Sequence, residues 1–221
     1  MNSLAASAAP FVESCRSATD PSIERLAACA KTCKGCDLWK HATQTVFGEG
    51  PQNARLMLVG EQPGDHEDLE GRPFVGPAGR LLDECLTEAG IERETIYLTN
   101  AVKHFKWVGR GLRRLHAKPS RGEIVACKPW LDEEIDTIDP EVVVCLGATA
   151  AQSLLGAKFK LMAERGQVLP FGAGRSVLAT IHPSAILRMP DRSAREESRN
   201  MLVADLALAV GTQKNPPRQT E

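Results

Sequence analysis

The chain has 221 residues, of which 43% are hydrophobic and 25% charged, and its net charge is −1. This length suits one sizeable core rather than two full domains. A near-neutral chain is not a polycation, so any contact with nucleic acid must come from a local basic patch. No apolar run approaches the ~18 residues of a membrane helix, and the first residues lack the pattern of a secretory signal. We therefore expect a cytoplasmic protein without a membrane partner.

Helices and short apolar strands are predicted to alternate along the chain. Residues 1–19 are predicted as a flexible arm, followed by a helix from Asp20-Pro21 to about Lys31. Short apolar runs predict strands over 55–60, 96–99, 142–146 and 177–181. Helical spacing predicts helices over 78–89, 148–155 and 195–210, and the capping-box spacing Ser120-Arg-Gly-Glu123 predicts another. Residues 103–119 are predicted as a long loop and residues 211–221 as a disordered tail.

This alternation predicts a three-layer α/β/α sandwich with a central, mostly parallel four-stranded sheet, in one domain over residues 20–210. Ligands of such folds bind beyond the carboxyl ends of the strands. The strand ends selected by this rule are Gly60-Glu61-Gln62-Pro63-Gly64, Thr99-Asn100, Leu146-Gly147 and Ile181-His182-Pro183-Ser184. Three of the four carry polar groups, which can converge on one pocket.

Basic residues are concentrated in the segment from Lys103 to Lys128, which holds eight Lys or Arg and one acid, Glu123. It contains Arg113-Arg114-Leu115-His116. A solvated surface loop is one interpretation. The density of positive charge beside the carboxyl edge of the sheet favours binding of a phosphate backbone instead.

The seven cysteines are odd in number and unevenly spaced, which fits reduced thiols or metal ligands better than disulfides. Cys33 and Cys36 have chelate spacing, although two chance cysteines in a loop would give the same pattern. The others, Cys15, Cys29, Cys85 and Cys145, are expected to be thiols of the arm or the core.

From about Cys33 to the last helix, the chain resembles family 4 uracil-DNA glycosylases. The motifs that carry the resemblance are Gly60-Glu61-Gln62-Pro63-Gly64, Gly71-Arg-Pro-Phe74-Val-Gly-Pro-Ala-Gly79, Thr99-Asn100-Ala-Val-Lys103, Leu146-Gly147-Ala148 and His182-Pro183-Ser184. Within that family the chain is most similar to the UdgX branch, whose members become covalently attached to uracil-containing DNA. The marks of the branch are Glu61-Gln62-Pro63-Gly64-Asp65, Val102-Lys103-His104-Phe105 and the basic segment that ends in His116. Where the branch has Lys-Arg-Arg-Ile-His, this chain has Leu112-Arg113-Arg114-Leu115-His116, so one lysine is replaced.

The resemblance implies a [4Fe–4S] cluster held by Cys33, Cys36, His104 and Cys127, with a histidine where the usual family pattern has a cysteine. Thiolates favour iron–sulfur or zinc, and the spacing alone does not separate the two. We expect a structural role, in which the cluster ties together the Cys33 loop, the segment after Asn100 and the helix containing Cys127.

The resemblance and the chemistry of uracil assign further roles around the base. Phe74 is expected to stack on the flipped uracil, and Asn100 to donate to its O4 and accept from its N3–H, a pattern that rejects cytosine. His182 is expected to donate to O2 as that oxygen becomes anionic, and Glu61 to stabilise the cationic sugar. Supporting roles are assigned to Gln62 and Asp65 in the pocket and to Arg113, Arg114 and Ser184 on phosphates. The alternatives are core packing for Phe74, a turn for Asn100, a loop histidine for His182, a salt bridge for Glu61 and surface charge for the arginines.

His116 is predicted to attack C1′ of the deoxyribose as a neutral imidazole, because a held imidazole is a better nucleophile than water. The predicted activity is that of a single-turnover, monomeric uracil-DNA glycosylase, which ends covalently bound to its DNA and prefers single-stranded substrate. The alternatives are an ordinary multiple-turnover family 4 enzyme that uses water, with His116 as an unreactive DNA contact, and a non-catalytic single-stranded DNA-binding iron–sulfur protein.

Overall fold

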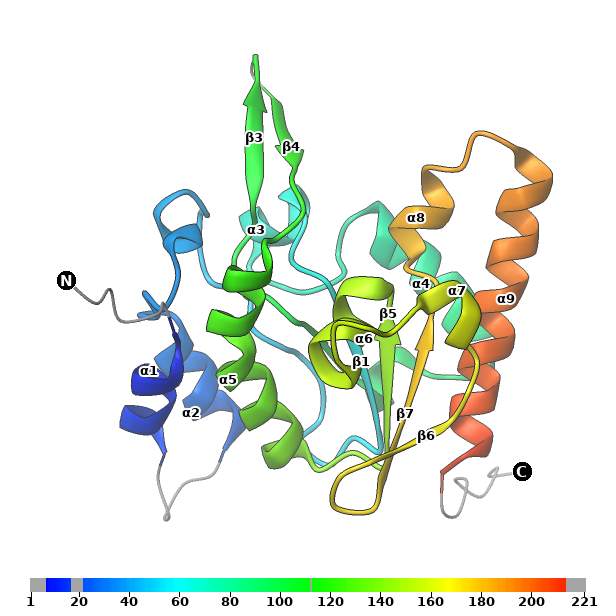
Figure 1. Ribbon diagram of the computed structural model, residues 1–221, viewed down its shortest axis with the longest axis horizontal. Helices are drawn as coiled ribbons and strands as arrows, with labels where there is room; N and C mark the ends of the chain where they lie inside the picture. The colour runs from blue at the N-terminus through cyan, green and yellow to red at the C-terminus, as the bar shows by residue number, and fades with distance from the viewer. Residues whose placement is uncertain (1–6, 17–21, 112, 214–221) are drawn as a thin grey trace.

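The protein is a three-layer α/β/α sandwich, as predicted (Figure 1). A computed structural model describes residues 7–16, 22–111 and 113–213. The central sheet has the order β2-β1-β5-β7-β6 and comprises β1 (Leu56–Gly60), β2 (Tyr97–Asn100), β5 (Val142–Leu146), β6 (Leu169–Phe171) and β7 (Arg175–Thr180). Four strands are parallel, and β6 runs antiparallel to β7 at the edge.

The fifth strand, β6, was missed because it is three residues long and contains Pro170. Proline cannot donate to a ladder and is tolerated at a sheet edge, so β6 carries almost no strand signal of its own. The sheet is therefore five-stranded rather than four-stranded.

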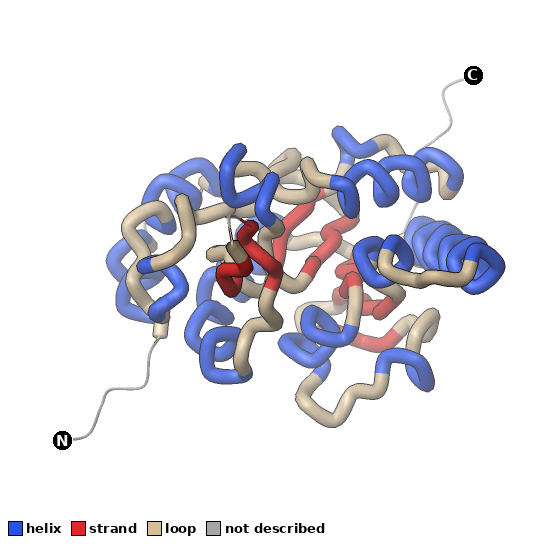
Figure 2. Tube along the Cα trace, turned by 90° about the horizontal axis from the view of Figure 1, so that it is seen from above, coloured by secondary structure: helices blue, strands red, loops and turns tan. Residues whose placement is uncertain are grey.

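Strand residues alternate between two hydrophobic cores, one on each face of the sheet. Met57 and Val59 of β1 belong to one core, whereas Leu56 and Leu58 belong to the other. This is the two-residue period of a strand that is covered on both sides. Figure 2 shows the strands passing between helices on both sides.

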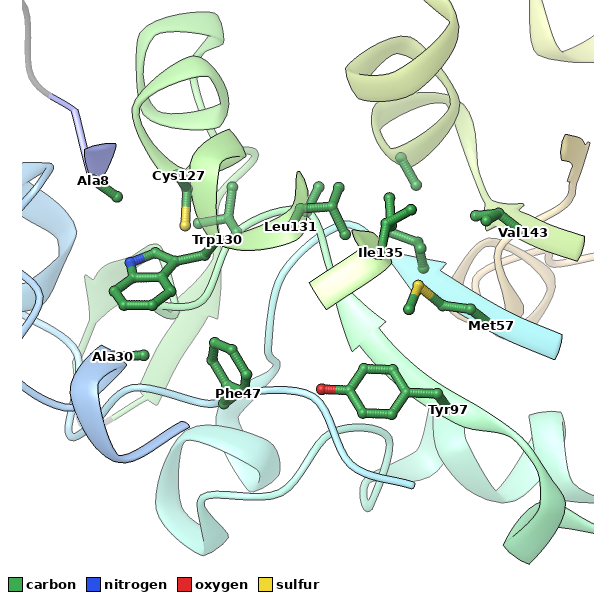
Figure 3. Packing of buried hydrophobic residues seen from close by; sticks show 14 of the residues in the cluster. Ala8, Ala30, Phe47, Met57, Tyr97, Cys127, Trp130, Leu131, Ile135 and Val143 are labelled. Atoms are coloured by element: carbon green, nitrogen blue, oxygen red, sulfur yellow. The ribbon is translucent and has the colours of Figure 1, made fainter. Parts of the chain in front are cut away.

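The first core is covered by α1 (Ala9–Cys15), α2 (Ile23–Ala30), α5 (Arg121–Ile138) and α6 (Ala148–Leu155). Trp130 of α5 is fully buried there and packs edge-on against Phe47, with ring centroids 5.9 Å apart (Figure 3). The second core is covered by α4 (Pro77–Glu88), α8 (Pro183–Leu187) and α9 (Arg192–Gly211). None of the helices in the described ranges is both long and apolar enough to cross a membrane.

Several helix ends follow the predicted capping chemistry. Ser120 and Glu123 form both hydrogen bonds of the capping box at the start of α5, and Gly156 follows α6. Helix α2 begins at Ile23 with Ser22 as its N-cap, whereas the predicted start at Asp20-Pro21 lies outside the described residues. The first residue of the predicted tail, Gly211, is the last residue of α9. Residues 214–221 lie outside the described residues.

The described part of the predicted N-terminal arm, residues 7–16, contains helix α1, which packs against α2 and α5. Its Cys15 forms a disulfide with Cys29 of α2, which corrects the prediction that both are reduced thiols. The pairing follows from the packing of the two helices, which places the two Cα atoms 6.1 Å apart. No helix was predicted before Asp20, so nothing in the predicted elements brought these two cysteines together. Five further cysteines in the described ranges are free and buried, including Cys85 and Cys145 as predicted.

Residues 103–119 were predicted as a long loop, but they contain a β-hairpin. Its strands are β3 (Trp107–Arg110) and β4 (Arg113–His116), and Gly111 takes a positive φ of 60° at the turn. The hairpin projects from the end of the molecule to which the β5 and β7 arrows point (Figure 1). Consequently His116, the last residue of β4, is held at the base of a defined element.

The remaining short helices are η1 (Asp37–Lys40), α3 (Asp65–Glu70), η2 (Arg93–Thr95) and α7 (Leu161–Glu164).

Candidate active site

A cavity of about 830 Å³ opens at the carboxyl edge of the sheet. Its walls come from the segments that follow all four parallel strands, together with the Phe74 loop, α7 and the base of the hairpin. Eight of the predicted catalytic and binding residues line it: Glu61, Gln62, Asp65, Phe74, Asn100, His116, His182 and Ser184. Arg113 and Arg114 are not among the lining residues.

Phe74 and Asn100 form one end of the cavity, above Gly60. A Cβ at Gly60 would lie 2.3 Å from Asn100 Oδ1 and 2.7 Å from Phe74 Cζ, so only glycine leaves room for both side chains. Within the described part of the chain, the Asn100 amide has no hydrogen-bond partner, although the residue is buried. Its donor and acceptor are therefore available to a ligand.

The Phe74 backbone is in the left-handed region, with a φ of 55°, which is unfavourable for a residue with a bulky side chain. Arg93 holds this conformation by donating to the carbonyl oxygens of Pro73 and Phe74, each at 3.2 Å. The Phe74 ring lies 6.2 Å from the His182 ring, with an angle of 27° between the planes. These contacts fix the ring as a wall of the cavity.

His182 is the N-cap of α8, and its protonation is set by its neighbours. Its Nδ1 accepts from the Ser184 backbone N–H at 3.0 Å and lies 2.8 Å from Ser184 Oγ. The pKa of His182 is lowered to about 4, mainly by burial and to a smaller extent by the positive charge of Arg188. A backbone N–H can only donate, so Nδ1 is unprotonated and the neutral ring carries its proton on Nε2. The ring is thus a neutral donor, and Ser184, predicted to contact a phosphate, is engaged with His182.

His116 lines the same cavity and lies beside Glu61. The distance from His116 Nε2 to Glu61 Oε1 is 3.4 Å, and Thr149 Oγ1 donates to the other carboxylate oxygen. Burial lowers the pKa of His116, Arg188 lowers it further, and Glu61 acts in the opposite direction. The net direction is downward from 6.5, so the imidazole is mainly neutral at pH 7 and one of its ring nitrogens carries a lone pair.

Sequence reasoning missed Thr149 and Arg188. Thr149 is the second residue of α6, the helix that follows β5. It lies two residues beyond Leu146-Gly147, so the strand-end rule would have included it if the selected segment had been two residues longer. Arg188 follows α8 and lines the cavity, but nothing in its local sequence distinguishes it from an ordinary surface arginine.

Gln62 acts on the hairpin rather than in the cavity. Its Nε2 donates to the carbonyl oxygens of Lys106 and Ala117, and its Oε1 accepts from the Lys106 N–H, each at 3.1 Å. Both ends of the amide are therefore occupied by the two strands at the base of the hairpin. The amide therefore fastens the base of the hairpin next to His116, the residue before Ala117.

Arg114 anchors the hairpin to α3. Its Nε lies 2.6 Å from Asp65 and its Nη1 2.6 Å from the fully buried Asp68, and the guanidinium also stacks on Phe105 and Trp107. The carboxylates of Asp65 and Asp68 and two aromatic rings therefore hold the guanidinium of Arg114, where a phosphate contact was predicted. Arg113 is exposed, and Leu112 lies outside the described residues.

The four predicted metal ligands line a second, small cavity with Trp130 and Lys103. Cys33 Sγ accepts from Trp130 Nε1 at 3.2 Å and from the Gly35 N–H at 3.4 Å, and Cys127 Sγ accepts from the Lys103 N–H at 3.3 Å. Such N–H···S contacts are typical around cluster thiolates. Even so, the described residues hold no group of three or more Cys, His, Asp or Glu arranged to bind a metal ion.

Burial acts on the protonation of the same ligands. It raises the pKa of Cys127 to about 12 and that of Cys36 above its usual value, and it lowers the pKa of His104 to about 4. His104 Nε2 lies 2.9 Å from Thr45 Oγ1, which leaves the other ring nitrogen for a metal. Three thiols and a neutral imidazole are a donor set that fits an iron–sulfur cluster.

Fold and cavity together define an α/β protein with a cavity at the carboxyl edge of its parallel sheet, lined by an aromatic ring and several polar side chains. A family model described as "Uracil DNA glycosylase superfamily" matches residues 47–207, and the chain belongs to this superfamily.

Curated relatives agree with this assignment. The chain is 40% identical over 180 residues to a type-4 uracil-DNA glycosylase of Thermotoga maritima, which covers 81% of this chain and 88% of the relative. It is 36% identical over 199 residues to the type-4 enzyme of Sulfurisphaera tokodaii, covering 85% and 86% respectively. A type-5 uracil-DNA glycosylase of Pyrobaculum aerophilum is 30% identical over 174 residues, covering 71% and 73%.

Proposed function

We propose that the protein excises uracil from DNA, preferably single-stranded, and remains attached to the deoxyribose through His116. The observation that carries the proposal is the placement of a neutral imidazole beside the Glu61 carboxylate, in the same cavity as Phe74, Asn100 and His182. The superfamily membership supports uracil as the base. The proposal differs from ordinary glycosylase action only in the group that captures the sugar.

Recognition of the base rests on two side chains. Phe74 stacks on the flipped ring, and the free Asn100 amide donates to O4 and accepts from N3–H. Cytosine presents an acceptor at N3 and a donor at its exocyclic amine, so it would leave both groups of the buried amide unpaired. Single-stranded DNA avoids the cost of unpairing the target base, which favours it as substrate.

Cleavage breaks the bond between N1 of uracil and C1′, and the electron pair leaves with the base. His182 Nε2–H donates to O2, where negative charge develops, and Glu61 faces the positive charge on the sugar. The lone pair of neutral His116 then forms a bond to C1′ and the imidazole becomes an imidazolium. This product lacks a good leaving group, so the adduct persists and the protein acts once.

The experiment is a denaturing gel of the protein mixed with a uracil-containing single-stranded oligonucleotide. The wild type should give a heat-stable band of lower mobility, at one DNA per protein. His116→Ala should give no such band, and His41→Ala, which changes an exposed histidine outside the cavity, should behave as the wild type. Free abasic DNA with many turnovers from the wild type would refute the covalent step and favour the type-4 reaction with water. Binding without release of any base would refute the glycosylase activity.

We also propose that Cys33, Cys36, His104 and Cys127 hold a [4Fe–4S] cluster, which ties their three segments together. Anaerobically purified protein should be brown and contain iron. Cys127→Ser should lose iron, whereas Cys145→Ser, at a buried thiol outside the small cavity, should keep it. A colourless protein that contains zinc would contradict the cluster.

A further inference from the structure

The main cavity is larger than one pyrimidine requires. Its volume of about 830 Å³ is near the upper end of the roughly 300–1,000 Å³ found for sites that enclose drug-sized ligands. A uracil ring between Phe74, Asn100 and His182 would occupy one end of it. The rest of the cavity remains to be explained.

Part of the cavity lining is apolar, and some of it is exposed. This part comprises Leu161 and Met162 of α7, Leu187 of α8 and Met189, which we call the α7–α8 ledge. Met162 is 71% exposed and Leu187 is 43% exposed, although both are large hydrophobic side chains. Exposed apolar side chains that adjoin a polar site favour contact with a flat apolar group of a ligand.

A positively charged residue, Arg188, lies between Leu187 and Met189 of the ledge in the chain. Arg188 lines the cavity and, among the described residues, its side chain has no hydrogen-bond or ion-pair partner. It shares this cavity with His116 and His182, and its charge lowers the pKa of both rings. Lys118, after the hairpin, lines the same cavity. An apolar ledge with a free cation beside it matches a nucleotide, which has a flat base and an anionic phosphate.

We propose that the α7–α8 ledge binds the base of the nucleotide next to the target uracil in the same strand, with the phosphate between them on Arg188. The inference rests on the proposed function, because it needs the uracil to occupy the Phe74 end of the cavity. A neighbouring base that is paired in a duplex cannot leave its stack to reach the ledge. The ledge therefore selects DNA that is unpaired at the neighbouring position as well as at the uracil.

The test measures affinity by fluorescence anisotropy, with single-stranded oligonucleotides that carry 2′-fluoro-2′-deoxyuridine, a nucleoside whose glycosidic bond resists cleavage. Three oligonucleotides are compared: one with normal bases, one with the 5′ neighbour replaced by an abasic spacer, and one with the 3′ neighbour so replaced. The wild type should lose roughly 10-fold in affinity when one particular neighbour lacks its base, as expected for loss of one stacked base. The double variant Met162→Ala/Leu187→Ala should bind the normal oligonucleotide about as weakly, and should lose nothing further with the spacer.

Val125→Ala, which removes an exposed apolar side chain from α5 outside the cavity, is the matched control and should behave as the wild type. Arg188→Gln should weaken binding to all three oligonucleotides by the same factor and reduce the dependence on salt. A wild type that is insensitive to both spacers would overturn the ledge proposal, and so would a double variant that keeps the full sensitivity. Failure of the proposed function has a different signature, since a natural uracil oligonucleotide would then yield neither free base nor adduct.

Discussion

His116 and His182 lie in one cavity and are both kept neutral, but they are arranged for opposite tasks. The Nδ1 of His182 is occupied by Ser184, which leaves Nε2–H as a donor toward the cavity. Among the described residues, the polar contact of the His116 ring is the 3.4 Å approach of Glu61, and the proposed mechanism uses the lone pair of the neutral ring for attack. Arg188 lowers the pKa of both rings, so a single cation supports both protonation states.

The protonation of His116 predicts the acid limb of the pH profile for adduct formation. In the proposed mechanism only the neutral imidazole attacks, and the pKa of His116 in the folded protein is lowered from 6.5. The rate constant should therefore be level near pH 7 and fall on acidification, with a midpoint below 6.5, as measured in single-turnover time courses. Arg188→Gln removes a charge that lowers the pKa and should move the midpoint upward. A wild-type midpoint at or above 6.5 would contradict this account.

At the scale of elements, the hairpin β3–β4 decides where His116 lies. It is held at its base by the Gln62 amide and along its side by the ion pairs of Arg114 with Asp65 and Asp68. Asp68 is fully buried and also accepts from the Thr43 N–H at 3.0 Å. The hairpin is thus fastened to α3 and to the strand-end segment after β1.

Releasing this clamp should impair attachment more than base cleavage. Arg114→Ala leaves the buried Asp68 carboxylate without its cation, at a cost to stability of about 3–5 kcal/mol. We expect the rate of adduct formation to fall at least about 10-fold, because proximity of the nucleophile is lost, while uracil release is less affected. Arg113→Ala, at an exposed neighbour, should reduce DNA affinity in a salt-dependent way and leave the ratio of adduct to free base unchanged. Equal behaviour of the two variants would refute the clamp.

The sequence predicted those elements whose signals are local. The buried strands β1, β5 and β7, the capping box of α5 and the end of α6 at Gly156 all depend on residues within a few positions of one another. The strand-end rule also selected Glu61, Asn100 and His182, because parallel strands deliver their carboxyl ends to one edge.

The hairpin could not be predicted in this way, because its clamp joins Arg114 to Asp68, 46 residues earlier. For the same reason, no local signal predicted the hydrogen bonds of the Gln62 side-chain amide to the base of the hairpin. The contact of Thr149 with Glu61, 88 residues away, had no local signal either. Helix α1 and its disulfide were missed because the segment before Asp20 carries little helical signal of its own and packs against α2 and α5, which follow later in the chain.

For the molecule as a whole, a buried ion pair stands between the two cavities. Lys103 Nζ donates to Glu134, to Thr99 Oγ1 at 2.7 Å and to the Asn100 carbonyl at 2.7 Å, while its backbone N–H donates to Cys127. Glu134 also accepts from Tyr97, Thr99 and the Gly48 N–H, each at 3.0 Å. The network links the backbone of the base-reading Asn100 to the small cavity of the proposed cluster.

Lys103→Met should destabilise the protein strongly, because it leaves the Glu134 carboxylate buried without its cation. A loss of about 3–5 kcal/mol in the free energy of unfolding is expected from urea denaturation. Lys128→Met breaks a largely exposed pair with Asp132 on the same helix and should cost less than about 1 kcal/mol. A Lys103→Met protein with wild-type stability would show that the network does not hold the two cavities together.

The central claim is that one imidazole captures the sugar after the base departs. Mass spectrometry of proteolytic fragments, after reaction with a short uracil oligonucleotide and nuclease trimming, tests it most directly. The account predicts that a deoxyribose-containing mass is found on the fragment containing His116, and that tandem fragmentation localises it to the imidazole. An unmodified His116 fragment, accompanied by stoichiometric free uracil and abasic DNA, would contradict the account.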